Sequence, residues 1–464
     1  MHFLRSLLHN PSLKWILVGA AVAVVTPRTA SAEALLLVEA DTGKVLQADN
    51  ATMPWYPASV TKMMTAYVTL KAVKDGRFTL DQMFTVSPVA ASQSPSKMGL
   101  RPGTQVTVEN ALAMMMVKSA NDMAVVLAEG VGGSIDGFSA LMNETARKLG
   151  MTQTSYVNPN GLPADGQITS ARDLAILARA IIRDLPDYEY FYHIPSIRYG
   201  RRVTNNFNHL IGRYPGADGF KTGFICASGY NLVGSATRNG KRLIAVVLGS
   251  TSGHQRAVRA AQLLERGFAS NGLGWLRPSL GTVDNLVPID ASPPNLRDEM
   301  CGGKRKRPAS DDDDETAISS PSGGESPAMF FTSGLQPPMP KASEMLAAGP
   351  AASEPMVVYT GPKKTGAALI AAVATDSERQ TPAKRGKRSR VAAAKPDAGA
   401  APKAEAKSDA KPKSDAKPAA KPVRHASAKP DAAAKPAEKP AAATPKPAKP
   451  KAAAKPKSDT KPAG

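Results

Sequence analysis

The sequence is poor in aromatic residues, which make up 5% of its 464 residues, whereas proline occurs 39 times. The aromatic residues lie mainly in the first 280 or so positions, and the far C-terminal part has almost none. A packed core needs large apolar side chains. The composition therefore predicts one folded domain and excludes a second core in the remainder of the chain.

Histidine and cysteine are scarce too. The 6 histidines are scattered, and the acidic run 311–315 lacks the spaced ligands and the glycine of a calcium loop. We therefore expect no metal site and no cofactor. The two cysteines, Cys226 and Cys301, can form one disulfide in an exported protein, which would tie the segment after the last helix to the core. The alternative is two free thiols, one of them buried.

Long apolar runs are lacking after the N-terminus, so no later stretch is expected to cross a membrane. The N-terminus itself is basic, continues with the apolar run 15–25 and reaches a small-residue site at 30–32. This order is typical of an export signal over residues 1–32 that leaves Glu33 as the new N-terminus. The alternative is an uncleaved anchor. We expect export to the periplasm or cell envelope and leave membrane association open.

Basic residues outnumber acidic ones, and the excess of positive charge is unevenly distributed along the chain. The formal net charge is +20, and from Thr381 onward 22 Lys and Arg stand against 7 Asp and Glu. Proline recurs there every few residues and breaks the helix that Ala and Lys favour. We expect a signal at 1–32, a folded domain at 33–270, and an irregular segment at 271–303 that packs on or leaves the core. A disordered low-complexity region would follow at 304–464, rich in Lys, Ala and Pro from 381.

The apolar spacing predicts strands, then helices, then strands and a last helix. A hairpin is expected over 33–47, helices over 59–73, 106–129, 134–149 and 170–182, strands over 230–236 and 242–250, and a helix over 255–268. Asn239-Gly240 is a hairpin turn signal between the two late strands. The order predicts an α+β fold, in which helices flank an antiparallel sheet and a helical lobe is inserted.

A serine and a lysine three residues apart are the first candidate for chemistry. Ser59 and Lys62 occupy positions i and i+3 of a predicted helix, so their side chains share a face. A lysine can take the serine's proton if it is neutral, which requires burial or a neighbouring cation. An isolated match of this kind is more often a capping serine with a surface lysine.

Two further motifs follow along the chain. In Ser119-Ala120-Asn121, the hydroxyl can relay a proton and the amide can hold a carbonyl, although ordinary helix-end chemistry is the alternative. In Lys221-Thr222-Gly223, the lysine can supply charge near Lys62, and the glycine lets a substrate lie close to a strand. A second Lys-Thr-Gly at 364–366 is treated as chance.

Together, in this order, the three motifs resemble the active-site set of serine β-lactamases and penicillin-binding proteins. The stretches 57–64, 161–173 and 229–233 are similar to the low-molecular-weight D-alanyl-D-alanine carboxypeptidases, within a resemblance that covers roughly 33–268. The resemblance implies a β-lactamase/transpeptidase-like fold. It also implies an enzyme that trims the terminal D-alanine from peptidoglycan pentapeptides and that β-lactam antibiotics inhibit covalently.

The resemblance also implies roles for the catalytic residues. Ser59 would form the acyl-enzyme, with Lys62 as its general base. Ser119 would pass a proton to the leaving amine, and Asn121 would position Lys62 and the substrate.

The remaining roles concern binding. Lys221 would contribute charge and Thr222 a hydroxyl toward the substrate carboxylate, beside Gly223. The backbone N–H groups of Ser59 and Phe224 would form the oxyanion hole. Arg256 falls where the family places an arginine for the terminal carboxylate.

The sequence departs from the family at two places. Phe224 stands where some relatives carry histidine, so a side-chain contact would be lost and a backbone donor kept. Several relatives have a second β-sandwich domain and an amphipathic membrane anchor, for which the segment after Phe268 looks too short and disordered.

Three alternatives stay open. A D,D-endopeptidase shares every motif. A β-lactamase usually needs a water-activating glutamate, and no convincing Glu-x-x-x-Asn lies between Asn121 and Lys221. The third is a protein that binds anionic wall or membrane groups through its basic tail. The tail could equally be a solvated tether with no fixed partner. Export argues against nucleic acid as a partner.

Overall fold

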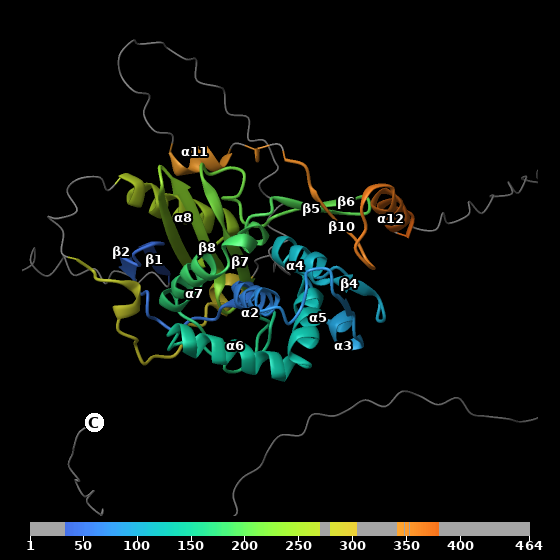
Figure 1. Cartoon of the computed structure of the whole chain (residues 1–464). Coiled ribbons are helices and arrows are strands. Elements are labelled where there is room, and N and C mark those ends of the chain that lie inside the picture. The colour runs from blue at the N-terminus through green and yellow to red at the C-terminus, as the bar shows by residue number, and fades with distance from the viewer. Residues whose placement is uncertain (1–32, 270–278, 304–340, 348, 352, 380–464) are drawn as a thin grey trace, which may run out of the picture. The chain divides into compact units, whose positions relative to one another are not determined.

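The computed structural model describes residues 33–269, 279–303, 341–347, 349–351 and 353–379 of the chain. The export signal expected over 1–32 and the basic tail expected from residue 381 therefore lie outside the described residues. Figure 1 gives the arrangement of the described elements.

A five-stranded antiparallel sheet forms the centre of the domain (Figure 1). Its order is β2-β1-β9-β8-β7, with β1 at Ala34–Glu39, β2 at Val45–Asp49, β7 at Ala217–Ile225, β8 at Gly229–Arg238 and β9 at Lys241–Ser250. The predicted β1–β2 and β8–β9 hairpins are both confirmed. Asn239 and Gly240 have φ values of 50° and 75°, as a two-residue hairpin turn requires.

The sheet is buried on both faces, as the side-chain alternation along β9 makes plain. Ile244, Val246 and Leu248 belong to the core on one face, and Leu243, Ala245 and Val247 to the core on the other. Because successive side chains of a strand point to opposite faces, a continuous apolar run can fill both cores. Helices therefore cover the sheet on each side, which confirms the predicted α+β layering.

The helices divide between the two faces. The first core contains residues of α2, α4, α5 and α7, and the second core contains residues of α8 and α11. The helical elements are η1 (Ala58–Thr61), α2 (Lys62–Lys74), α3 (Pro88–Ser92), α4 (Val108–Val117), α5 (Asn121–Gly132), α6 (Ile135–Leu149), α7 (Ala171–Asp184), η2 (Pro186–Tyr192), α8 (Gly253–Ala269), η4 (Val283–Asn285), α9 (Arg297–Cys301), α11 (Ala342–Ala347) and α12 (Gly366–Arg379).

The single helix predicted over 106–129 is wrong. A short strand comes first, Thr107 caps α4 by accepting from Asn110 N, and the chain leaves the helix at Lys118 before α5 begins at Asn121. Ser119 has a φ of 59°, in the left-handed region that no regular helix contains. The polar residues Lys118, Ser119, Asn121 and Asp122 interrupt the apolar run at this break.

Short strands that the sequence did not predict build the side of the domain away from α8. β3 (Met83–Thr85) pairs with β4 (Gln105–Thr107), and β5 (Ser196–Tyr199) pairs with β6 (Arg202–Asn205). β10 (Met356–Val358) adds to β5 in parallel. At three or four residues, each strand of the two antiparallel pairs is too short for a period of two to stand out.

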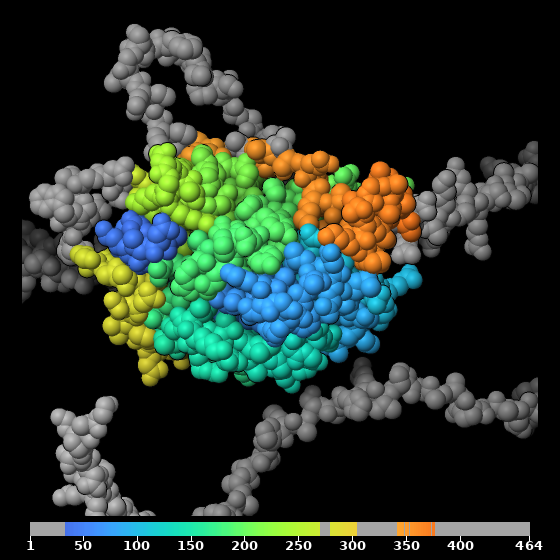
Figure 2. Space-filling view, in the orientation of Figure 1, coloured from blue at the N-terminus to red at the C-terminus, as the bar shows by residue number. Residues whose placement is uncertain are grey.

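The expectation of disorder throughout 304–464 is wrong for residues 341–379. Leu346 of α11 is buried in the core on the α8 side, and Val358 of β10 is buried in the other core. Tyr359 N donates to Asn110 Oδ1, which ties the segment to α4. Figure 2 shows this segment in orange against the rest of the domain. Tertiary contacts thus order a stretch whose composition predicted disorder.

In the part of the chain that the structure describes, no single helix is long and apolar enough to cross a membrane. By length and composition alone, the bent pair of α5 and α6 passes the same test together.

Removing residues 341–464 should destabilise the domain, whereas removing 380–464 takes away no contact that the structure describes. The longer deletion exposes the pockets of Leu346 and Val358 and unpairs the β5 edge. Full burial of each side chain stabilises the folded state by about 1.5–3 kcal/mol. The melting temperature should therefore fall by roughly 5–10 °C. Circular dichroism melts of the two truncated proteins check this, and equal melting temperatures would contradict the packing described.

Candidate active site

Ser59 and Lys62 meet where η1 passes into α2. Lys62 Nζ lies 2.8 Å from Ser59 Oγ, as positions i and i+3 on one helical face allow. The lysine side chain is completely buried, and the serine is partly exposed. A buried amine thus faces a hydroxyl that a substrate can reach.

Two further oxygens surround the Lys62 amine. Nζ lies 2.7 Å from Asn121 Oδ1 and 2.7 Å from the backbone oxygen of Asn160. A neutral amine has two N–H donors and one lone pair. The two carbonyl oxygens can accept both donors, which leaves the lone pair for the Ser59 hydroxyl. The arrangement therefore suits a base that takes the serine's proton.

The turn between α4 and α5 brings the second motif to the same place. Asn121 begins α5, and its Nδ2 donates to the backbone oxygens of Ser94 and Pro95 at 3.0 and 3.2 Å. These bonds fix the amide so that its oxygen faces Lys62. Ser119 is buried, and within the described residues its Oγ has no hydrogen-bond partner. A buried hydroxyl without a partner costs free energy, so this group is available to a substrate.

Asp122, in the first turn of α5, holds the adjoining loop. The Asp122 carboxylate accepts from Met98 N at 3.1 Å and from Gly99 N at 2.9 Å. Burial raises the pKa of this carboxyl above its usual value, although the backbone N–H groups of both residues favour the charged form. The loop at 94–99 is thereby attached to the helix that carries Asn121.

The third motif lies on β7, the edge strand of the large sheet. Lys221 and Thr222 are each 1% exposed, and Lys221 Nζ donates to Thr222 O at 3.1 Å. In the described part of the chain, Thr222 Oγ1 has no hydrogen-bond partner. A Cβ on Gly223 would lie 2.6 Å from Ser59 N, so only glycine lets the strand approach Ser59 this closely.

Phe224, near the end of this strand, and Arg256 both contact the ring of Tyr230. The Phe224 and Tyr230 ring centroids are 4.3 Å apart, and the Arg256 guanidinium lies 5.4 Å from the Tyr230 ring centroid. Arg256 is 3% exposed, and its Nη2 donates to Phe207 O at 3.3 Å. Its role toward a substrate carboxylate stays a prediction, as does the oxyanion role of the Phe224 N–H.

Asn160 is a residue of the site that sequence reasoning did not single out. It contributes a backbone oxygen, which a motif of side chains cannot predict. The Asn-Pro-Asn-Gly sequence at 158–161 is a turn signal and was the one available clue. Thr65 Oγ1 donates to Pro159 O at 2.6 Å, which attaches this turn to α2.

A disulfide joins Cys226 and Cys301 in the structure, with a Cα–Cα distance of 5.6 Å. Cys226 follows β7 directly, and Cys301 ends α9. Leu296 N also donates to Ala227 O, so residues 279–303 pack against the turn that follows the third motif. Across the residues described, no group of three His, Cys, Asp or Glu side chains could hold a metal ion.

Comparison with known proteins supports the family resemblance that the three motifs carry. The family model described as D-alanyl-D-alanine carboxypeptidase matches residues 21–252. The D-alanyl-D-alanine carboxypeptidase DacC of Escherichia coli is 38% identical over 256 residues, which cover 54% of this chain and 64% of that protein. DacB2 of Mycobacterium tuberculosis, with the same description, is 34% identical over 251 residues, covering 52% of this chain and 83% of that protein.

Solved structures of penicillin-binding proteins are also similar to this chain. The crystal structure of penicillin binding protein 5 from Haemophilus influenzae superposes with a TM-score of 0.50 at 37% identity, covering 53% of this chain and 73% of that one. Penicillin binding protein 6B from Escherichia coli gives 0.50 at 36%, covering 53% and 79%. The chain spans just under two thirds of the length of the first curated relatives it matches.

Gly161→Ala should slow acylation by a fluorescent penicillin by about 100-fold, because it displaces the turn that places the Asn160 oxygen. The new Cβ would lie 1.8 Å from Ala58 O, next to the nucleophile. Gly166→Ala is the matched control, since Gly166 has a similar φ of 83° but meets nothing closer than 3.6 Å. Stopped-flow labelling compares the two variants, and equal rates would show that the turn does not position Lys62.

Proposed function

The chain belongs to the D-alanyl-D-alanine carboxypeptidase family, and on that premise we propose that it removes the terminal D-alanine from peptidoglycan pentapeptides through an acyl-enzyme on Ser59. The observation that carries this proposal is the position of Lys62 Nζ, which lies 2.8 Å from Ser59 Oγ inside a site closed to solvent on the lysine side. Such a pair supplies both a nucleophile and a base.

The first stage forms an ester. Ser59 Oγ bonds to the carbonyl carbon of the penultimate D-alanine while its proton passes to Lys62 Nζ. The C–N bond then breaks, and the terminal D-alanine leaves as an amine that takes a proton through the Ser119 hydroxyl. The backbone N–H groups of Ser59 and Phe224 donate to the carbonyl oxygen while it is negatively charged.

The second stage regenerates the enzyme. A water molecule gives a proton to Lys62 and bonds to the ester carbon. The bond to Ser59 Oγ breaks, the oxygen regains a proton and the shortened peptide leaves. Throughout, Lys221 supplies positive charge. The Thr222 hydroxyl, which has no partner among the described residues, and Arg256 would bind the carboxylate of the substrate.

The proposed substrate places the protein in the periplasm or cell envelope, where peptidoglycan lies. The basic, apolar and small-residue order of residues 1–32 supports export, although these residues lie outside the described part of the chain. The contact of the basic tail with wall carboxylates or lipid phosphates stays a prediction for the same reason. β-Lactam antibiotics are the proposed covalent inhibitors.

The full chain should release one D-alanine from each molecule of a defined muropeptide pentapeptide, and Ser59→Ala should lower this rate by at least about 1000-fold. The loss is expected because the variant has no oxygen to form the ester. Mass spectrometry of the peptide, with D-alanine counted by an oxidase-coupled assay, measures it. Thermal melts check that Ser59→Ala keeps the fold.

Two outcomes would contradict the proposal. If a cross-linked dimer is cut much faster than the pentapeptide, the enzyme is an endopeptidase. If penicillin is hydrolysed over many turnovers without a lasting adduct, it is a β-lactamase. The segment 151–173, which supplies the Asn160 oxygen, contains no glutamate to activate water for that reaction.

A further inference from the structure

A cleft of about 830 Å³ lies beside the turn that carries the second motif. The loop 98–101, the β5–β6 hairpin, Lys118 and Thr360 form its walls. None of the residues assigned above to the reaction lines this space. It is therefore separate from the pocket of Ser59.

The cleft is joined to the catalytic turn by short contacts. Lys118 directly precedes Ser119, and Ser96 Oγ donates to Lys118 O at 2.9 Å. Asn121 N donates to Ser96 O at 2.8 Å, and Asp122 holds the backbone at Met98 and Gly99, which line the cleft. One rigid turn thus presents a catalytic hydroxyl to the reaction and a wall to the cleft.

The lining is positively charged. Among the described residues that form it, Arg101, Lys118 and Arg202 are cationic and none is acidic. Lys118 is 7% exposed, whereas the two arginines reach solvent. Carboxylates are among the anionic groups that arginine and lysine donors bind, and peptides carry them. We name this space the basic cleft.

One wall comes from a part of the chain beyond the family match. Thr360 follows β10, which pairs with β5, and Gly361 N donates to Gln105 O at 2.8 Å. Lys363 pairs with Asp81 at 3.0 Å. Thr360 therefore gives the basic cleft a lining residue that the matched residues 21–252 do not supply.

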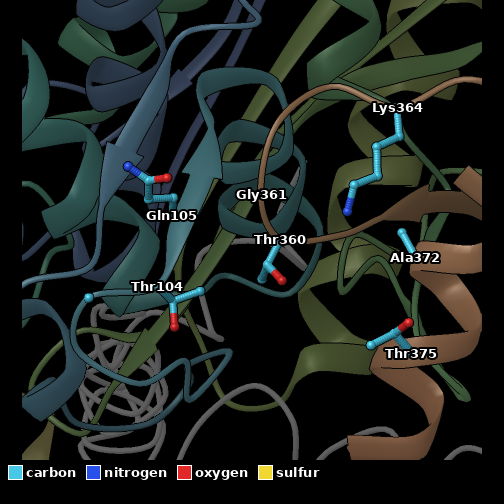
Figure 3. Close-up of a pocket in the computed structure, with 8 residues that line it drawn as sticks. Thr104, Gln105, Thr360, Gly361, Lys364, Ala372 and Thr375 are labelled. Atoms are coloured by element: carbon cyan, nitrogen blue, oxygen red, sulfur yellow. The ribbon is translucent and has the colours of Figure 1, made fainter. Parts of the chain in front are cut away.

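Thr104 and Thr360 also line a second, smaller cavity of about 390 Å³. Figure 3 shows it with Thr104 and Gln105 on one side, Lys364, Ala372 and Thr375 on the other, and Thr360 with Gly361 between them.

We propose that the basic cleft binds a free carboxylate of the substrate peptide, on residues ahead of the D-alanyl end that reacts at Ser59. The inference rests on the proposed function for the identity of the peptide. A peptide whose terminal carbonyl lies at Ser59 has its remaining residues outside the nucleophile's pocket, and the cleft beside Ser119 offers them cations. The ligand class is thus an acidic peptide.

The test measures binding without turnover. The full chain carrying Ser59→Ala is titrated calorimetrically with two synthetic pentapeptides that share a D-Ala-D-Ala end. One has a free side-chain carboxylate upstream, and the other has the matching carboxamide. The acidic peptide should bind about fivefold more tightly, as two partly exposed ion pairs allow.

Arg202→Gln, added to this protein, should lower the ratio of the two affinities from about fivefold to about twofold, because it removes one of the two ion pairs. Arg201→Gln is the matched control, because it removes the same charge from the next residue, which does not line the basic cleft. It should leave the ratio unchanged. Arg101→Gln, on the opposite wall, should act like Arg202→Gln, so the result does not depend on one variant's folding.

Equal affinity of the two peptides for the parent protein, or binding of neither, overturns the proposal. So does an equal effect of Arg201→Gln and Arg202→Gln, which would indicate a general charge effect. Because this titration needs no catalysis, it is independent of the D-alanine release assay. A preserved affinity ratio with no D-alanine release would reject the proposed function and keep the basic cleft.

Discussion

Three oxygen atoms around the Lys62 amine set the geometry on which the rest of the site depends. They belong to Ser59, Asn121 and Asn160, which lie 3, 59 and 98 positions away in the sequence. One comes from η1, one from the start of α5 and one from a turn. A buried amine without such partners would be strongly disfavoured. The fold therefore has to hold three separate segments within hydrogen-bond distance of one atom.

The surrounding packing explains how that is done. α4 and α5 are buried almost throughout, so the turn between them cannot shift without opening the core. Gln167 donates to Thr61 Oγ1 and holds the Asn160 turn on α2, while Gly223 lets β7 lie against the nucleophile. The same rigid turn lines the basic cleft. Catalysis and the proposed recognition of the peptide thus share one structural support.

The sequence predicted what depends on local geometry. The i, i+3 spacing placed Lys62 beside Ser59, and alternation and turn signals predicted both hairpins of the large sheet. The single helix predicted over 106–129 was wrong, because the left-handed φ of Ser119 separates α4 from α5. Asn160 was missed because it acts through its backbone. Residues 341–379 were misjudged, since their order comes from pairing and burial against distant elements rather than from their composition.

The central claim is that Lys62 removes the proton of Ser59. The most direct test is peptide mapping by mass spectrometry after brief exposure of the full chain to penicillin, for the native protein and for Lys62→Ala. The account predicts a penicilloyl adduct on the peptide that contains Ser59 in the native protein and none in the variant over the same time, with both proteins folded by circular dichroism. An adduct that forms at a similar rate in Lys62→Ala, or that lies on another residue, would contradict it.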